Sequence, residues 1–415
     1  MKNNRIIKNT FMLYLLTAAK IILPLVLLPF LARIFTKETY GLLNYVKAIM
    51  QYLQLFVDFG FLLSATKDIA CTSKDKAKLN YIVGETVLSK LVLAFMALIF
   101  LVILIVNSKL LKDNFVFVFL SFIPVILSCF FMDFFFRGIE EMHVLTLRFV
   151  VMRGLSTLLT LYFVRSDQDL LWIPVWEIVG STAALVLIIV EVRRRNLRLY
   201  IYNFKSILMR IKASSIYFLS DVSSTIFTIF NTILVGVYMN VVQVADWTMC
   251  LNIVSGIQML YSPITGGIYP YMVKNKNLFL IRKILVIIMP LIFLGCVILY
   301  VFSPFILSVV GGEKYIKDAD LLRAFIPLII ISFPTLLLGW PCLGAIEKQN
   351  ENTYTTLIAS FIQIFGLISL VYFDSFKLIN IALLRGITEL LLLIMRLFFV
   401  VKNRNLFNKN TYLGI

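Results

Sequence analysis

Histidine is nearly absent from this 415-residue chain, which carries only His143. Metal sites built from several histidines are therefore excluded, and little room is left for Ser-His or Cys-His nucleophilic catalysis. The five cysteines are scattered, so they form neither a disulfide framework nor a metal-ligand spacing. A glycine-rich phosphate loop is also missing, as is a soluble stretch long enough for a nucleotide-binding domain. We therefore expect a protein that is not an enzyme and uses no metal or cofactor.

Charged residues are also scarce. They make up 15% of the sequence against 60% hydrophobic residues, far from the soluble balance of roughly half apolar and a quarter charged. Because a bilayer-spanning helix needs about 20 mostly apolar residues, the chain offers about twelve spans joined by short polar segments. The spans are expected at Phe11–Ala32, Leu42–Leu63, Tyr81–Val106, Phe115–Phe136, Val144–Val164, Leu171–Val190, Ile216–Met239, Trp247–Tyr269, Ile284–Phe305, Leu321–Leu343, Thr353–Phe373 and Ile379–Val401. The sequence therefore predicts an all-α integral membrane protein.

The basic residues behind the net charge of +17 gather in alternate loops. The densest groups are Lys67–Lys78 after the second span and Arg193–Lys212 after the sixth. The positive-inside rule assigns these loops, and with them both termini, to the cytoplasm. The first span exceeds a signal-peptide core and lacks a small-residue cleavage site, so it is expected to remain. This distribution favours a multi-pass membrane protein and argues against nucleic acid as a partner.

The longest polar segment, Glu191–Ala213, divides the spans into two sets of six. We therefore expect two six-helix bundles, residues 1–200 and 201–415. The helix pair in Tyr14–Asp68 and the pair in Tyr217–Pro270 follow the same design, which indicates a duplication. Because each half starts on the cytoplasmic side, the repeats would be parallel, with a substrate cleft between them near the bilayer midplane.

Polar residues recur along the second span at spacings of four and three, which places them on one helical face. They are Tyr40, Asn44, Lys47, Gln51, Gln54 and Asp58. In hydrocarbon an exposed polar group costs several kcal/mol, so this face must meet protein or a water-filled cavity. The seventh and eighth spans carry matching stripes that include Asp221, Asn231 and Asn252, and the first span contributes Lys20. Polar faces in equivalent helices of both halves predict a hydrophilic cleft.

Other polar residues within the spans have simpler interpretations. Small ones such as Ser224 and Thr228 are expected to hydrogen-bond neighbouring helices. Arg385 and Glu389, four residues apart, are expected to neutralise each other. Asp133, Arg137 and Arg148 lie near predicted helix ends, where snorkelling to the headgroups explains their charge.

The segment from Tyr40 to Ala70 reads YGLLNYVKAIMQYLQLFVDFGFLLSATKDIA. It closely resembles the polysaccharide-unit flippases of the Wzx type, whose superfamily also contains MATE drug exporters and lipid II flippases. Further resemblance lies in Arg5–Thr10 (RIIKNT) and in the proline-bearing first helix that ends PFLARIF. Beyond Ala70 only the pattern of spans carries the match.

The resemblance implies translocation of an undecaprenyl-pyrophosphate-linked oligosaccharide from the cytoplasmic to the periplasmic leaflet of a bacterial inner membrane, for O-antigen or capsule assembly. A polysaccharide polymerase and a chain-length regulator would be its partners. Since a bare pyrophosphate cannot cross hydrocarbon, Lys20 and Lys47 are expected to stabilise it. Stacking and hydrogen bonds to sugar rings are expected from Tyr40, Asn44, Tyr45, Gln51 and Gln54. Asn231 and Asn252 are further cleft candidates. In an alternating-access cycle, Asp58 and Asp221 are the candidates for a coupling proton or sodium ion.

Two alternatives stay open. A drug or organic-cation exporter of the same superfamily would favour an acidic cleft, whereas the second-span stripe holds Lys47 and Asp58. A membrane-bound O-antigen polymerase or glycosyltransferase typically needs a sizeable outward loop. Here the longest loop is basic and predicted to be cytoplasmic, so the polymerase is the weaker alternative.

Overall fold

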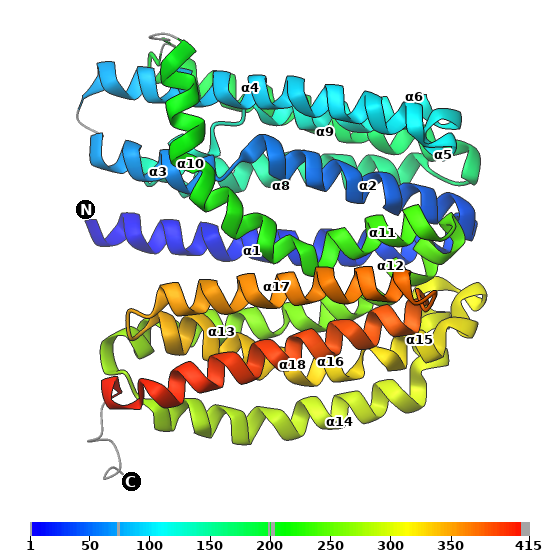
Figure 1. Cartoon of the computed structure of the whole chain (residues 1–415). Coiled ribbons are helices and arrows are strands. Elements are labelled where there is room, and N and C mark those ends of the chain that lie inside the picture. Colours follow the sequence, from blue (N-terminus) through cyan, green and yellow to red (C-terminus); the bar gives the residue numbers. More distant parts are fainter. Residues whose placement is uncertain (1, 73–74, 198–199, 201–203, 408–415) are drawn as a thin grey trace. The chain divides into compact units, whose positions relative to one another are not determined.

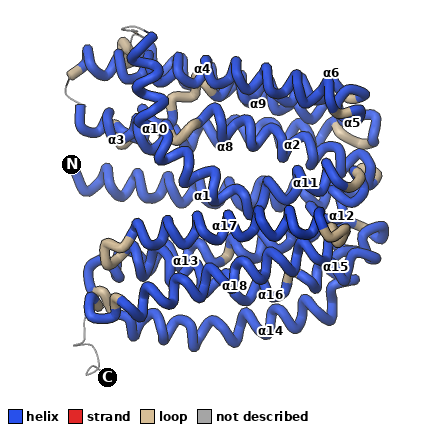
Figure 2. Tube along the Cα trace, in the orientation of Figure 1, coloured by secondary structure: helices blue, strands red, loops and turns tan. Residues whose placement is uncertain are grey.

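A computed structural model of the chain describes residues 2–72, 75–197, 200 and 204–407 (Figure 1). Nearly all of these residues are helical, and they contain no strand (Figure 2). Ten helical segments in the described part are long and apolar enough to cross a bilayer. They are Phe11–Ile34, Lys37–Thr72, Lys76–Asn107, Phe115–Gly138, Met142–Phe163, Asp167–Arg194, Leu278–Gly311, Ile326–Gly344, Gln349–Tyr372 and Leu378–Lys402. The prediction of an all-α, multi-pass membrane protein is confirmed.

The predicted seventh and eighth spans are built from shorter helices. The seventh comprises α10 (Phe204–Thr225), a π-helical turn η2 (Ile226–Phe230) and α11 (Asn231–Tyr238). The eighth comprises α12 (Val241–Met259) and α13 (Tyr261–Asn275). Neither is among the ten apolar helices, so the count of twelve spans stays a prediction.

The chain divides into two compact units. Unit 1 comprises Met1–Thr39 and Leu43–Val222, and unit 2 comprises Tyr40–Leu42 and Ser223–Ile415. The change from one unit to the other therefore occurs inside the seventh span, just before the π-helical turn. The parallel-repeat arrangement and its predicted boundary at residue 200 remain predictions.

Unit 1 is a bundle in which α8 packs along both α1 and α9. Its helices are α1 (Lys2–Ile34), α2 (Lys37–Asp58), α3 (Phe61–Thr72), α4 (Lys76–Asn107), α5 (Lys109–Asp113), α6 (Phe115–Ser128), α7 (Asp133–Gly138), α8 (Met142–Phe163), the 3-10 helix η1 (Asp167–Leu171), α9 (Trp172–Arg194) and α10. Gly180 lets α9 approach α8 closely, because a Cβ there would collide with the carbonyl oxygen of Met152. That close approach brings polar side chains of α8 and α9 together.

Unit 2 places α18 against both α16 and α17. Its helices are α11, α12, α13, α14 (Leu278–Gly311), the 3-10 helix η3 (Glu313–Asp318), α15 (Ala319–Ala324), α16 (Ile326–Leu337), the π-helical turn η4 (Leu338–Gly344), α17 (Gln349–Tyr372), α18 (Leu378–Lys402) and the 3-10 helix η5 (Arg404–Leu406). An apolar core that includes Phe333, Leu337 and Leu343 fills this unit.

Candidate functional site

Helix α2 holds the predicted polar stripe and is fixed at both ends. At its start the Thr36 hydroxyl accepts a bond from the Thr39 amide, and Thr36 donates its own amide to Asp167 Oδ1 at 2.9 Å. At its end Phe59 and Gly60 adopt the left-handed conformation, with φ of 40° and 70°, and the chain turns into α3. Gly60 lies so close to Tyr217 of α10 that a side chain would not fit. The stripe is therefore held on a rigid element.

Lys47, in the middle of the stripe, is half-buried in unit 1. The charges of Glu177 and Arg153 act on it from α9 and α8. These two residues form an ion pair, with Arg153 Nη1 and Glu177 Oε1 3.1 Å apart. The group therefore contains two cations and one carboxylate, which leaves it positively charged.

Lys20 of α1 lies against the same helix as Arg153. Its ammonium nitrogen is 5.6 Å from the centre of the Phe149 ring, and Phe149 precedes Arg153 by one turn of α8. A cation over an aromatic face at this distance is attracted by the ring quadrupole. Two predicted cleft residues, Lys20 and Lys47, thus both interact with the Phe149–Arg153 segment of α8.

Asp58, at the end of α2, is already paired with a lysine. Its Oδ1 lies 2.7 Å from Lys90 Nζ of α4, and its Oδ2 accepts a bond from Gln54 Nε2 at 2.8 Å. Gln54 also donates to Ser128 Oγ of α6 at 2.9 Å. The predicted residues Gln54 and Asp58 therefore act as polar connections between α2, α4 and α6.

Asp133 and Arg148 contradict the snorkelling interpretation. Arg148 is 7% exposed, and its Nη2 lies 2.6 Å from Asp133 Oδ2. Its guanidinium also stacks 4.5 Å from the centre of the Phe131 ring. Position near a predicted helix end was the wrong guide, because the chain breaks between α6 and α7 and Asp133 pairs there with a buried arginine. The charge of Lys90 also acts on Asp133, so the Asp58–Lys90 and Asp133–Arg148 pairs form one balanced group.

The two coupling-ion candidates lie near each other in unit 1. Asp221 of α10 is half-buried, and the charge of Asp58 acts on it. The sequence separation of these residues gave no hint of this proximity. Their roles stay a prediction.

The remaining stripe residues differ in environment. Gln51 is exposed, and Asn44 is half-buried with polar or electrostatic contacts of its own. Tyr40, assigned to unit 2, is 3% exposed and packs edge-on against Tyr315 of η3, with ring centres 6.2 Å apart. Burial raises the pKa of the Tyr315 phenol, and the Tyr40 phenol and the Asp246 carboxylate add to this. Tyr40 therefore serves packing in this conformation.

Asn231 of α11 is fully buried in unit 2. Its Nδ2 donates to the Phe227 carbonyl at 3.0 Å, and its Oδ1 accepts from Gln363 Nε2 of α17 at 3.3 Å. Gln363 Oε1 in turn accepts from Thr388 Oγ1 of α18 at 2.7 Å. Sequence reasoning missed Gln363, although a buried glutamine in an apolar helix is itself a signal. Asn252 on α12 is half-buried and lies outside this network as described.

Two arginines of α18 are buried in unit 2. Arg385 Nη2 lies 2.7 Å from Glu389 Oε2, as the four-residue spacing predicted, and the guanidinium sits 4.4 Å from the centre of the Phe227 ring. Arg396 Nη1 donates to the Thr335 carbonyl at 2.7 Å, and its Nη2 donates to Thr356 Oγ1 at 3.1 Å. Arg396 thus ties α18 to the end of α16 and to α17.

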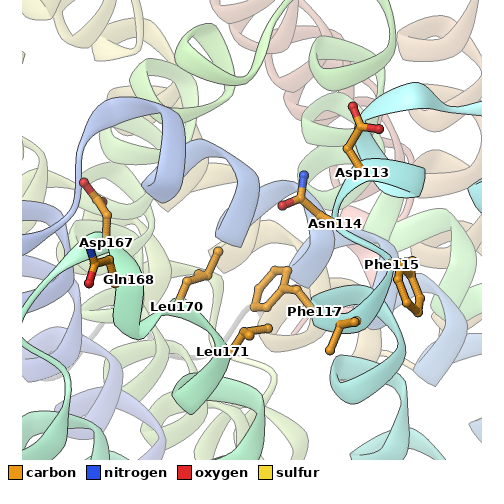
Figure 3. Close-up of a pocket in the computed structure, with 9 residues that line it drawn as sticks. Asp113, Asn114, Phe115, Phe117, Asp167, Gln168, Leu170 and Leu171 are labelled. Carbon is orange, nitrogen blue, oxygen red and sulfur yellow. The ribbon is translucent and has the colours of Figure 1, made fainter.

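Two surface hollows lie in unit 1. One of about 280 Å³ contains none of the predicted site residues, and Figure 3 shows Asp113 and Asn114 on one side of it with Asp167 and Gln168 on the other. Asp167 is the residue that holds the start of α2. The other, of about 320 Å³, lies beside Arg210, which pairs with Asp68 and Glu85. In the described part of the chain, no group of three or more His, Cys, Asp or Glu could hold a metal ion.

Comparison with known families and proteins gives concordant matches. The sequence model of the family described as "Polysaccharide biosynthesis protein" matches residues 6–276. A Shigella dysenteriae protein named for O-antigen transport is 25% identical over 338 residues, which cover 80% of this chain and 85% of the relative. An Escherichia coli K12 protein of the same name is 26% identical over 413 residues, which cover 96% of this chain and 97% of the relative.

Solved structures show the same fold at low sequence identity. The lipid II flippase MurJ in an inward closed conformation has a TM-score of 0.70 at 16% identity, covering 95% of this chain and 87% of its own. An inward-facing multidrug resistance MATE family transporter has a TM-score of 0.66 at 13% identity, covering 94% of this chain and 99% of its own. The chain therefore has the fold of these two transporters.

Proposed function

The chain belongs to the polysaccharide biosynthesis protein family, and on that premise we propose that it flips undecaprenyl-pyrophosphate-linked oligosaccharide repeat units across a bacterial inner membrane. The units would move from the cytoplasmic to the periplasmic leaflet for O-antigen or capsule assembly. Relatives named for O-antigen transport cover 80% and 96% of the chain, which supports this substrate class. The structural observation that carries the proposal is the excess of positive charge around Lys47 in unit 1.

The physical problem of flipping is the pyrophosphate. Burial of an unpaired charge in a low-dielectric core is far more costly than thermal energy, so a passing diphosphate needs cations along its path. Lys47 and Arg153 are both influenced by one carboxylate, Glu177, and Lys20 of α1 lies over Phe149, one turn before Arg153 on α8. The sugar would use hydrogen bonds from Asn44, Gln51 and Gln54 or, on unit 2, from Tyr40, Asn231 and Asn252, while the prenyl chain would remain in lipid.

We propose alternating access as the mechanism, with unit 1 and unit 2 moving relative to each other. Asp58 and Asp221 are the proposed sites of a coupling proton or sodium ion, supported by the mutual influence of their charges. Both termini would face the cytoplasm. A polymerase and a chain-length regulator would use the flipped units on the periplasmic side.

A drug exporter of the same superfamily is the second candidate. The similarity to the MATE structure, at 13% identity, shows a shared fold and does not indicate which substrate is transported. An organic cation would be repelled by a site with excess positive charge. The Lys47 group therefore favours the anionic substrate.

The test is glycan display in a flippase-null strain that makes a defined repeat unit. We expect the wild-type chain to restore surface polysaccharide, and Lys47→Ala, Asp58→Asn and Asp221→Asn to impair it at equal protein level. Toxicant resistance is measured in parallel. Normal glycan in all three variants, or a change in resistance without any change in glycan, would contradict the proposal.

A further inference from the structure

Arg153 and Glu177 form an ion pair that spans two helices inside unit 1. Arg153 Nη1 and Glu177 Oε1 are 3.1 Å apart, and the arginine side chain is 50% exposed while the glutamate is 22% exposed. The close approach of α8 and α9 at Gly180, one turn after Glu177, makes this pair possible. A half-exposed ion pair that is open to water contributes little to stability. The bundle therefore has little structural need for it.

The surroundings of the pair are unusually cationic for unit 1. Lys47 of α2 feels the charges of both partners, and Lys20 of α1 lies over Phe149, one turn before Arg153 on α8. The region therefore holds three cations and one carboxylate. In contrast, the neighbouring Asp58–Lys90 and Asp133–Arg148 pairs match one acid with one base. Among the described residues, the group around Lys47 therefore carries more positive than negative charge.

We propose that Arg153 and Lys47 form a diphosphate-binding site in which Glu177 holds Arg153 until the ligand takes its place. The inference rests on the proposed function and names the part of the substrate that unit 1 recognises. A planar guanidinium binds two phosphate oxygens at once, whereas a lysine offers a compact point charge. The excess of two positive charges matches the two charges of a diphosphate diester better than the single charge of a monophosphate diester.

Glu177 is the residue that distinguishes a binding site from a structural pair. If the pair only stabilises the bundle, loss of either partner should have the same effect. If the ligand competes with Glu177 for Arg153, Arg153→Gln should weaken binding, and Glu177→Gln should strengthen it by removing the competing carboxylate. The two substitutions therefore have opposite signs under this proposal.

The experiment measures binding of two farnesyl probes, a sugar-linked diphosphate diester and a sugar-linked monophosphate diester, to the purified full-length protein by native mass spectrometry. The wild type should prefer the diphosphate. Lys47→Gln and Arg153→Gln should each weaken diphosphate binding about tenfold, the usual effect of losing one charge-assisted hydrogen bond. Glu177→Gln should strengthen it several-fold. Arg323→Gln is the matched control, because that arginine pairs with Asp320 in unit 2 at 2.8 Å.

Three results would overturn the proposal. In the first, the wild type binds both ligands equally well. In the second, Arg153→Gln binds the diphosphate as tightly as the wild type does. In the third, Glu177→Gln weakens binding as much as Arg153→Gln does. Glycan display in the flippase-null strain is scored separately for the same variants. Complementation by the wild type together with any of the three results rejects this site and retains the proposed function, whereas failed complementation by well-expressed wild type rejects the function itself.

Discussion

Unit 1 and unit 2 stabilise their buried polar groups in different ways. Unit 1 links helices by ion pairs, such as Asp58 with Lys90 and Asp133 with Arg148. Unit 2 links α11, α17 and α18 through the neutral Asn231, Gln363 and Thr388 side chains, and its buried Arg385–Glu389 ion pair lies within the single helix α18. Charged pairs inside a membrane protein carry a large desolvation cost and are usually retained for a functional reason. Ion pairs that join different helices therefore distinguish unit 1, where we propose that the charged part of the substrate binds.

Both units contain an interrupted helix that is accompanied by a buried arginine. In unit 1 the break between α6 and α7 includes Met132 at a φ of 52°, and Arg148 pairs with Asp133 immediately after it. In unit 2 the π-helical turn after α16 contains Gly339 with a ψ of −112°, and Arg396 donates to the Thr335 carbonyl. An interruption frees backbone groups that need new partners in a membrane. Arg396 donates a hydrogen bond directly to such a backbone carbonyl, that of Thr335, whereas Arg148 pairs with the Asp133 carboxylate.

The largest expected effect concerns Lys47. Lys47→Ala should reduce surface glycan in the complemented null strain at least tenfold, because the diphosphate loses a cation in the low-dielectric core. Surface polysaccharide is measured by antibody binding at matched protein level. Lys109→Ala is the control, since Lys109 is exposed at the start of α5. Equal amounts of surface glycan in the Lys47→Ala and Lys109→Ala strains would contradict the proposed role of unit 1 in binding the charged part of the substrate.

Asp133→Asn should destabilise the protein by about 3 kcal/mol or more, because it leaves the buried Arg148 without its counter-charge. Thermal unfolding in detergent measures this effect. The double variant Asp133→Asn with Arg148→Gln should recover much of the loss, since no unpaired charge then remains. A single variant as stable as the wild type would show that the pair is not buried as described.

Gln363→Leu in unit 2 should cost less, about 1–2 kcal/mol, because it leaves only the neutral Asn231 and Thr388 groups without their partner. The same unfolding assay applies, and glycan display should persist near the wild-type level. A loss of glycan with unchanged stability would show instead that unit 2 takes a direct part in recognition.

The smallest effect on glycan display is expected from a cross-link between α3 and the part of α10 that belongs to unit 1. The Ser64 and Ser214 hydroxyls lie 2.6 Å apart, and both residues are buried. If α10 moves with α3 as part of unit 1, a disulfide in Ser64→Cys/Ser214→Cys should leave glycan display unchanged. Display in cells treated with oxidant or with reductant provides the measurement. A block that reductant reverses would mean that this part of the seventh span changes partners during transport.

The sequence predicts much of this fold because its strongest signals are local. Apolar spans of about 20 residues and a single helix through Tyr40 and Asp58 depend only on neighbours along the chain, and the structure has both. Partners across helices could not be predicted in this way. Lys90 lies 32 residues from Asp58, and Glu177 lies 24 residues from Arg153, so helix periodicity carries no information on their pairing. The interpretation of Asp133 failed for the same reason.

The most direct test of the central claim follows lipid-linked repeat units in a strain that lacks this protein. The proposal predicts that undecaprenyl-pyrophosphate-linked units accumulate on the cytoplasmic leaflet, and that the wild type clears them whereas Lys47→Ala does not. Units that accumulate on the periplasmic leaflet would instead point to a polymerase. Absence of any accumulation, in a strain shown to synthesise the units, would contradict the account.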